Sequence, residues 1–146
     1  ALAQTPGEEH VANLLEAVKK LKAQKGVGKI GAIGFCFGGG LTWRLSTELP
    51  ELVAAAPFYG PAPDLTKVAN IKAAVLGIYG GNDSRINGGI PALEEALKKA
   101  GTRYELKIYE GANHAFNNDT GANYKKEAAD DAWARVLAFF GTQLKA

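Results

Sequence analysis

The stretch that decides the fold is Gly34-Phe35-Cys36-Phe37-Gly38-Gly39, which follows Lys29 and the apolar run Ile30-Gly31-Ala32-Ile33. The run shows little polar alternation, which is typical of a strand buried in a parallel sheet. The segment after it has the form Gly-x-nucleophile-x-Gly, a sharp strand-to-helix turn that exposes one reactive side chain. We therefore expect a strand over 29–35 and a helix over about 38–49, with Cys36 held between them.

The chain on either side continues the alternation of helices and strands. Before this strand, apolar residues recur at helical spacing and predict a helix over about 7–24. After the second helix we expect, in chain order, a buried strand over 52–59, a loop over 60–64, a buried strand over 73–80, a helix over 90–100, a half-exposed edge strand over 104–109 and a helix over about 124–144. The last helix is expected to bury Ala128, Trp133, Val136, Leu137 and Phe140.

This order predicts one α/β domain over 1–146, with a mainly parallel sheet of about four strands flanked by helices. In such sheets the binding site lies at the carboxyl ends of the strands. Cys36, Asp83 and His114 stand just beyond three different strands, with 47 residues from Cys36 to Asp83 and 31 from Asp83 to His114. A nucleophile, an acid and a base are therefore expected to meet at one end of the sheet.

Each residue has an expected role in nucleophilic catalysis. Cys36 is the nucleophile, because glycines flank it at a strand-to-helix junction and the amino end of the helix favours a thiolate through its dipole. The backbone N–H of Phe37 points the same way and donates to a developing oxyanion. His114 is the base that takes the thiol proton, and Asp83 fixes the tautomer of its ring.

Simpler interpretations exist for the same residues. A single cysteine is most often a small buried hydrophobe, an Asp after Gly80-Gly81-Asn82 often only shapes a turn, and a lone loop histidine is usually solvated. The sequence context outweighs the first interpretation, and the three residues together are more specific than any one. A Gly-x-Gly-x-x-Gly pattern over 26–31 does not indicate a nucleotide site, because it follows a helix and opens a strand.

Composition excludes several classes of protein. The 146 residues are 47% hydrophobic with a net charge of +2, and the basic residues are spread along the chain, which argues against nucleic-acid binding. No run reaches the roughly 18 apolar residues of a membrane helix. The single cysteine and two histidines form no intramolecular disulfide and no zinc cluster, so we expect a reducing, cytoplasmic setting without a metal.

The residues around the nucleophile resemble the dienelactone hydrolase family of α/β-hydrolases. Gly34 to Gly39 is similar to its nucleophile turn, with Cys in place of the usual Ser, and Asp83 and His114-Ala115-Phe116 match its other triad positions. The resemblance implies a partial α/β-hydrolase fold corresponding to the carboxyl-terminal part of the family. It also implies substrate contacts by Tyr59 and Phe116. Asn117-Asn118-Asp119 stand where the family has an arginine.

The resemblance implies a cysteine-dependent hydrolase of small lactones or carboxylic esters that needs no cofactor. The alternative is a truncated binding, redox or structural module that keeps the turn without the chemistry.

The expected sheet has consequences for assembly. The strand over 29–35 should be internal, yet a helix and no strand precedes it in this chain, so one edge lacks a partner. We expect this edge to pair with another copy of the chain, to exchange elements with it, or to dock an amino-terminal fragment of the same family. The simpler alternative, that the first helix folds over the edge, ranks lower because a helix cannot satisfy a row of strand hydrogen bonds. That fragment would also bring the second oxyanion donor.

Overall fold

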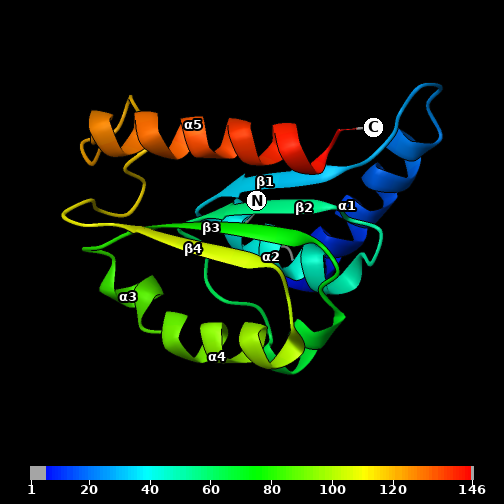
Figure 1. Ribbon diagram of the computed structural model, residues 1–146, viewed down its shortest axis with the longest axis horizontal. Helices are drawn as coiled ribbons and strands as arrows, with labels where there is room; N and C mark the ends of the chain where they lie inside the picture. The colour runs from blue at the N-terminus through cyan, green and yellow to red at the C-terminus, as the bar shows by residue number, and fades with distance from the viewer. Residues whose placement is uncertain (1–5, 146) are drawn as a thin grey trace.

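Four parallel strands form the sheet, in the order β1-β2-β3-β4, as Figure 1 shows for the computed structural model. The strands are β1 (Gly31–Phe35), β2 (Ala54–Phe58), β3 (Ala74–Gly80) and β4 (Tyr104–Tyr109). The structure describes residues 6–145, so residues 1–5 and 146 of the predicted domain lie outside this description. The predicted α/β class with a parallel sheet of about four strands is confirmed.

Helices cover both faces of the sheet. In Figure 1, α5 lies on one face, and α1, α2 and α4 lie on the other. Their bounds are α1 (Gly7–Lys22), α2 (Phe37–Glu48), α4 (Ile90–Ala100) and α5 (Lys126–Gln143), and the predicted ends of helices and strands lie within two residues of those observed. Two short elements escaped prediction, the 3-10 helix η2 (Leu65–Asn70) and the helix α3 (Ser84–Asn87). None of the helices within residues 6–145 combines the length and apolarity needed to cross a bilayer.

Alternation along the central strands divides the core into two layers. Ala56 and Phe58 of β2 face α5, where small side chains let the helix lie close to the sheet. Ala55 faces the opposite layer, where Trp43 of α2 is fully buried and donates a hydrogen bond from Nε1 to Tyr79 Oη at 3.0 Å. Both central strands are buried along their whole length, which agrees with their continuous apolar sequence.

The prediction that α5 buries Trp133 and Leu137 is wrong, because their exposed fractions are 46% and 57%. The face of α5 toward the sheet is formed by Ala128, Ala132 and Val136 at four-residue spacing. Trp133 and Leu137 belong to a neighbouring row that continues to Phe140. Phe140 packs over β1, since a Cβ at Gly31 would lie 2.8 Å from its Cε1, so this row follows the outer side of β1.

Within the described residues β1 pairs only with β2, so its other edge is open. Ile33 and Phe35 are 40% and 39% exposed and lie on the face of the strand that carries Gly31. Together with Trp133 and Leu137 they form an apolar surface at this edge, called the β1 edge surface below. The expected burial of β1 on both faces is therefore not observed in this chain.

The turn from β1 to α2 depends on glycines that leave no room for a side chain. A Cβ at Gly34 would lie 2.1 Å from the carbonyl oxygen of Gly38, and a Cβ at Gly60 would lie 2.3 Å from the carbonyl carbon of Gly39. Gly38 differs from the sequence expectation, because a Cβ there would meet no described atom within 4 Å outside its chain neighbours and the backbone of its own helix. Gly34, Gly39 and Gly60 therefore set the close approach of strand and helix.

We predict that Gly34→Ala destabilises the protein by about 3 kcal/mol or more, because its Cβ collides with backbone that cannot move without shifting α2. Gly38→Ala is the matched control, since it adds the same methyl group to open space and places a better helix former in α2. Its free energy of unfolding should change by less than about 1 kcal/mol. Urea denaturation followed by circular dichroism measures both values. Equal stability of the two variants would contradict this account of the turn.

Candidate active site

Cys36 lies at the tip of the turn, in a backbone conformation that few residues other than glycine adopt. Its φ is 56° and its ψ is −115°, and it is the residue that precedes the first turn of α2. Two hydrogen bonds hold this geometry: its N–H donates to Phe58 O at 3.0 Å, and its carbonyl accepts from Gly40 N at 3.2 Å. The thiol is free and exposed at the carboxyl end of β1.

Asp83 follows β3 and uses its two carboxylate oxygens differently. Oδ1 accepts a hydrogen bond from Ile86 N at 3.4 Å and so caps α3, whereas Oδ2 contacts His114 Nδ1. The side chain is buried, with a relative exposure of 7% for the residue. The turn-forming role and the contact with the histidine, which the sequence left as alternatives, are thus both present in the structure.

His114 lies between the other two residues, with Nε2 3.1 Å from Cys36 Sγ and Nδ1 against Asp83. The loops that carry the acid and the histidine are joined to each other. Asn82 N donates to Ala112 O at 2.9 Å, and the Asn82 side chain donates to Asn113 Oδ1 at 3.0 Å. The structure therefore brings Cys36, His114 and Asp83 into one chain of contacts at the carboxyl ends of the strands.

Phe37 and Tyr59 also lie at the site. The N–H of Phe37 belongs to the first turn of α2, whose N–H groups have no acceptor within the helix. The Tyr59 ring lies 5.0 Å from the His114 ring between centroids. Burial, and secondarily the charge of Cys36, raises the pKa of the Tyr59 hydroxyl to about 12, so it stays protonated at neutral pH.

Phe116 does not take the position expected of a substrate contact. Its exposed fraction is 0%, and its ring packs 5.7 Å from that of Tyr59 and 5.3 Å from that of Tyr109. The reason is the backbone at Ala115, whose φ of 63° turns the chain so that Phe116 enters the core. Phe116 packs against the Tyr59 ring from inside the core instead of lining the site.

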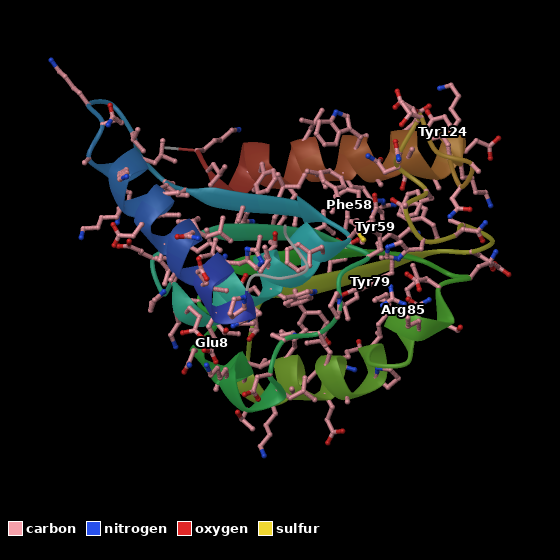
Figure 2. The ribbon with its side chains drawn as sticks, turned by 180° about the vertical axis from the view of Figure 1, so that it is seen from behind. Glu8, Phe58, Tyr59, Tyr79, Arg85 and Tyr124 are labelled. Atoms are coloured by element: carbon pink, nitrogen blue, oxygen red, sulfur yellow. The ribbon has the colours of Figure 1, made fainter. Side chains whose placement is uncertain are left out.

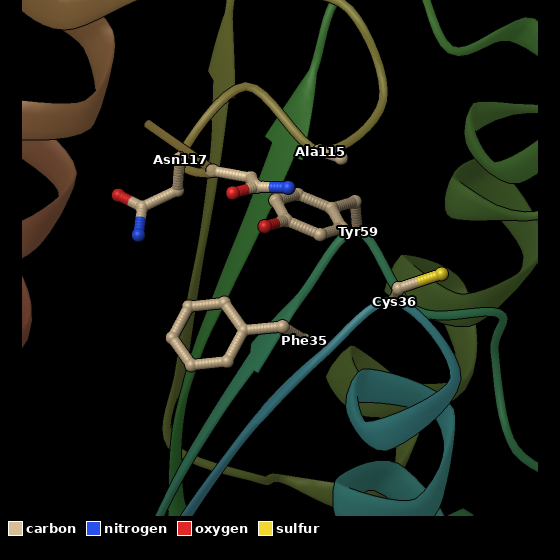
Figure 3. Close-up of a pocket in the computed structure, with 6 residues that line it drawn as sticks. Phe35, Cys36, Tyr59, Ala115 and Asn117 are labelled. Atoms are coloured by element: carbon tan, nitrogen blue, oxygen red, sulfur yellow. The ribbon is translucent and has the colours of Figure 1, made fainter. Parts of the chain in front are cut away.

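Two cavities meet at Cys36, and Figure 3 shows the first. The neutral cavity, of about 350 Å³, carries no charged side chain and is lined by Phe35, Cys36, Tyr59, Ala115, Asn117 and Asn118. In Figure 3 the sulfur of Cys36 points away from Phe35. The second, called the Arg85 cavity, has about 200 Å³ and contains Cys36, His114, Phe37 and Arg85 in its lining.

Sequence reasoning missed Arg85 and most of the residues of the neutral cavity. They are chain neighbours of residues that it did select: Arg85 comes two positions after Asp83, and Asn117 three after His114. That proximity was the available signal. Among residues 6–145, no group of three or more His, Cys, Asp and Glu side chains is placed to hold a metal ion.

A four-stranded parallel sheet with Cys36 in a sharp turn after β1, Asp83 after β3 and His114 after β4 has the arrangement of an α/β-hydrolase. The chain belongs to the dienelactone hydrolase family, whose sequence model matches residues 2–144.

Individual relatives agree with this assignment. The chain is 45% identical over 137 residues to a "Putative carboxymethylenebutenolidase" of Saccharolobus solfataricus, covering 93% of this chain and 52% of the relative. It is 30% identical to a protein of the same name from Escherichia coli K12, covering 95% and 56%. The crystal structure of a "Putative Dienelactone Hydrolase" from Klebsiella pneumoniae superposes with a TM-score of 0.87 at 31% identity, covering 96% of this chain and 63% of that one. The chain thus spans about half the length of the curated relatives it matches.

We predict that iodoacetamide alkylates Cys36 in the folded protein near neutral pH, faster than it alkylates a model thiol. The reason is that the exposed sulfur lies 3.1 Å from His114 Nε2, and a neighbouring imidazole favours the thiolate, which is the reactive form of a cysteine. His114→Asn should slow the reaction about tenfold or more. Mass spectrometry of the alkylated peptide gives the rates, with the urea-unfolded proteins as controls in which both react alike. Labelling only after unfolding would contradict the prediction.

Proposed function

We propose that this chain carries the reacting groups of a hydrolase of small carboxylic esters or lactones. The observation that supports the proposal most directly is the contact chain from Cys36 Sγ through the His114 ring to Asp83. The family membership supports the same reaction class. No cofactor takes part in the proposed reaction, because a thiol and an imidazole suffice for acyl transfer.

The proposed reaction has two halves. His114 Nε2 takes the thiol proton while Cys36 Sγ bonds to the carbonyl carbon, and the Phe37 N–H donates to the oxyanion that forms. The oxyanion collapses, the C–O bond to the leaving group breaks, and His114 returns the proton to the departing alkoxide. Water then attacks the thioester with His114 as base, which releases the carboxylic acid and restores the thiol. Asp83 stabilises the imidazolium in both halves.

Substrate contacts are proposed for Tyr59, which lines both cavities beside Cys36. A protonated Tyr59 hydroxyl adds no negative charge next to the thiolate. An exposed free thiol at the centre of the site suits a reducing compartment such as the cytoplasm.

We predict that the protein hydrolyses 4-nitrophenyl acetate and that Cys36→Ala or prior alkylation with iodoacetamide abolishes turnover. Asp83→Asn should lower kcat about 100- to 10,000-fold, because the histidine loses the group that sets its tautomer. Absorbance of released nitrophenolate measures the rate, and circular dichroism shows whether each variant is folded. Reversible oxidation of Cys36 without any ester turnover would instead favour a redox module.

We also propose that the open edge of β1 is covered by a strand from outside this chain, either from a second copy or from the amino-terminal part of a family member. The two ends of the sheet differ in protection. The outer strand β4 carries Glu105 and Lys107, charges of the kind that protect natural edges, whereas β1 carries none. The chain that supplies the covering strand is also the proposed source of a second oxyanion donor. Loss of one such donor typically lowers the rate about 100- to 1,000-fold.

In isolation the chain should therefore associate with itself in a concentration-dependent way, as measured by light scattering over a dilution series. Ile33→Lys in the β1 edge surface should shift it toward the monomer. Ile108→Lys is the matched control, because Ile108 is similarly exposed, at 45% against 40%, but lies on β4. A monodisperse monomer at high concentration, with β1 amides exchanging freely with solvent, would show that the β1 edge stays uncovered and would contradict the proposal.

A further inference from the structure

The histidine of the site is carried by a turn whose backbone geometry depends on its surroundings. Ala115, the residue after His114, has a φ of 63°, a conformation that costs free energy for a residue with a side chain. This conformation separates two neighbouring side chains, because His114 lies at the site whereas Phe116 is fully buried. The position of the base therefore depends on the contacts that stabilise this turn.

Three consecutive carbonyl oxygens of the turn accept hydrogen bonds from the segment that leads to α5. These bonds are Asn123 Nδ2 to His114 O at 2.9 Å, Asn118 N to Ala115 O at 3.0 Å and Lys125 N to Phe116 O at 3.0 Å. Figure 2 shows Tyr124, which belongs to the same segment, at the same end of the molecule as Tyr59. Two of the three donors are backbone N–H groups, so the bond to the histidine carbonyl is the one that depends on the type of side chain.

The other end of the Asn123 amide leads to the loop that carries the acid. Asn123 Oδ1 accepts a hydrogen bond from Asn113 Nδ2 at 3.4 Å, and Asn113 Oδ1 accepts one from Asn82 Nδ2 at 3.0 Å. Asn82 and Asn113 are the residues directly before Asp83 and His114. These three side chains, called the amide chain below, thus connect the loop of the acid to the carbonyl of the base.

The amide chain has no direct access to a bound substrate. The described residues that line the two cavities at Cys36 include none of its members. Its three residues are exposed, so each of their hydrogen bonds competes with water and contributes modestly. Any effect of these amides on the reaction therefore passes through the position of His114, and effects of a few-fold on rate are expected.

We propose that Asn123 is a positioning residue, which holds the His114 ring between the thiol and the acid by binding the carbonyl of the same histidine. The rest of the amide chain fixes the orientation of the Asn123 amide. This inference rests on the proposed hydrolase function and adds to it the residues that set the geometry of the base. Without the Asn123 N–H, the turn at Ala115 loses one of its three bonds, and the ring spends less time in contact with the sulfur.

Alkylation of Cys36 by iodoacetamide tests this role without requiring turnover. Asn123→Leu keeps a similar volume and adds no charge, and we expect it to slow alkylation of the folded protein about threefold, with the urea-unfolded variant as reference. The decisive measurement is the same substitution in a His114→Asn background, which keeps the carbonyl that Asn123 binds but removes the imidazole. A residue that acts through the imidazole has no further effect there, so the factor should fall to about one.

Thr120→Val is the matched control. The Thr120 hydroxyl donates to Asn118 Oδ1 at 2.8 Å within the same segment, but this bond does not involve the turn at Ala115. The control should leave the alkylation rate unchanged. Equal slowing by Asn123→Leu with and without the imidazole, or equal slowing by Thr120→Val, would show a general structural effect and would overturn the proposal. An unchanged rate in Asn123→Leu would overturn it as well.

The far end of the amide chain supplies a second test. Asn82→Leu should slow alkylation about twofold in the wild-type protein and have no effect when Asn123→Leu is already present. Independent effects of the two substitutions would overturn the role given to the rest of the amide chain.

Turnover separates this proposal from the proposed function. In Asn123→Leu, kcat/KM for 4-nitrophenyl acetate should fall by about the same factor as the alkylation rate. Absence of turnover in the wild-type protein would refute the proposed function alone, since alkylation still decides the role of Asn123. Normal turnover in the wild-type protein with unchanged alkylation in Asn123→Leu would refute the positioning role alone.

Discussion

The backbone conformation of Cys36 is the constraint on which the rest of the site depends. A non-glycine residue at φ 56° and ψ −115° persists only where its surroundings hold it, and here β2 accepts its N–H while the first turn of α2 binds its carbonyl. The absence of a side chain at Gly34 lets the helix start within one residue of the strand. The thiol consequently projects from the end of the sheet, where His114, which follows β4, contacts it and Asp83, which follows β3, contacts His114.

Asp83 connects His114 to the short helix α3. One of its oxygens contacts the histidine that faces the thiol, and the other caps the helix that carries Arg85. The side chain is buried, so leaving either oxygen unpaired costs more than it would at the surface. The acid therefore fixes two things at once, the orientation of the His114 ring and the position of the cation on the far side of the Arg85 cavity. Hydrogen bonds between the Asn82 and Asn113 loops add to this rigidity.

The elements that the sequence predicts well are those whose signals are local. Continuous apolar runs predicted β2 and β3, and the glycines around Cys36 predicted the sharp turn there, because strand burial and close backbone approach both restrict the residue type. The position of Phe116 was predicted wrongly because it depends on the φ of 63° at Ala115. The residue type alanine does not indicate a positive φ. Arg85 was missed because α3 spans only four residues, too few to show a period. Trp133 and Leu137 were expected inside because both are apolar, and residue type alone did not separate their row from the row of Ala132 and Val136 that faces the sheet.

The open edge of β1 and the two cavities are connected through Phe35. This side chain belongs to the β1 edge surface and also lines the neutral cavity, so whatever covers the edge also reshapes the cavity on that side of Cys36. The Arg85 cavity does not include Phe35, although it shares with the neutral cavity Cys36, the residue directly after β1. If an outside strand covers the edge as proposed, exchanging that strand alters the neutral cavity while leaving the contacts among Cys36, His114 and Asp83 in place.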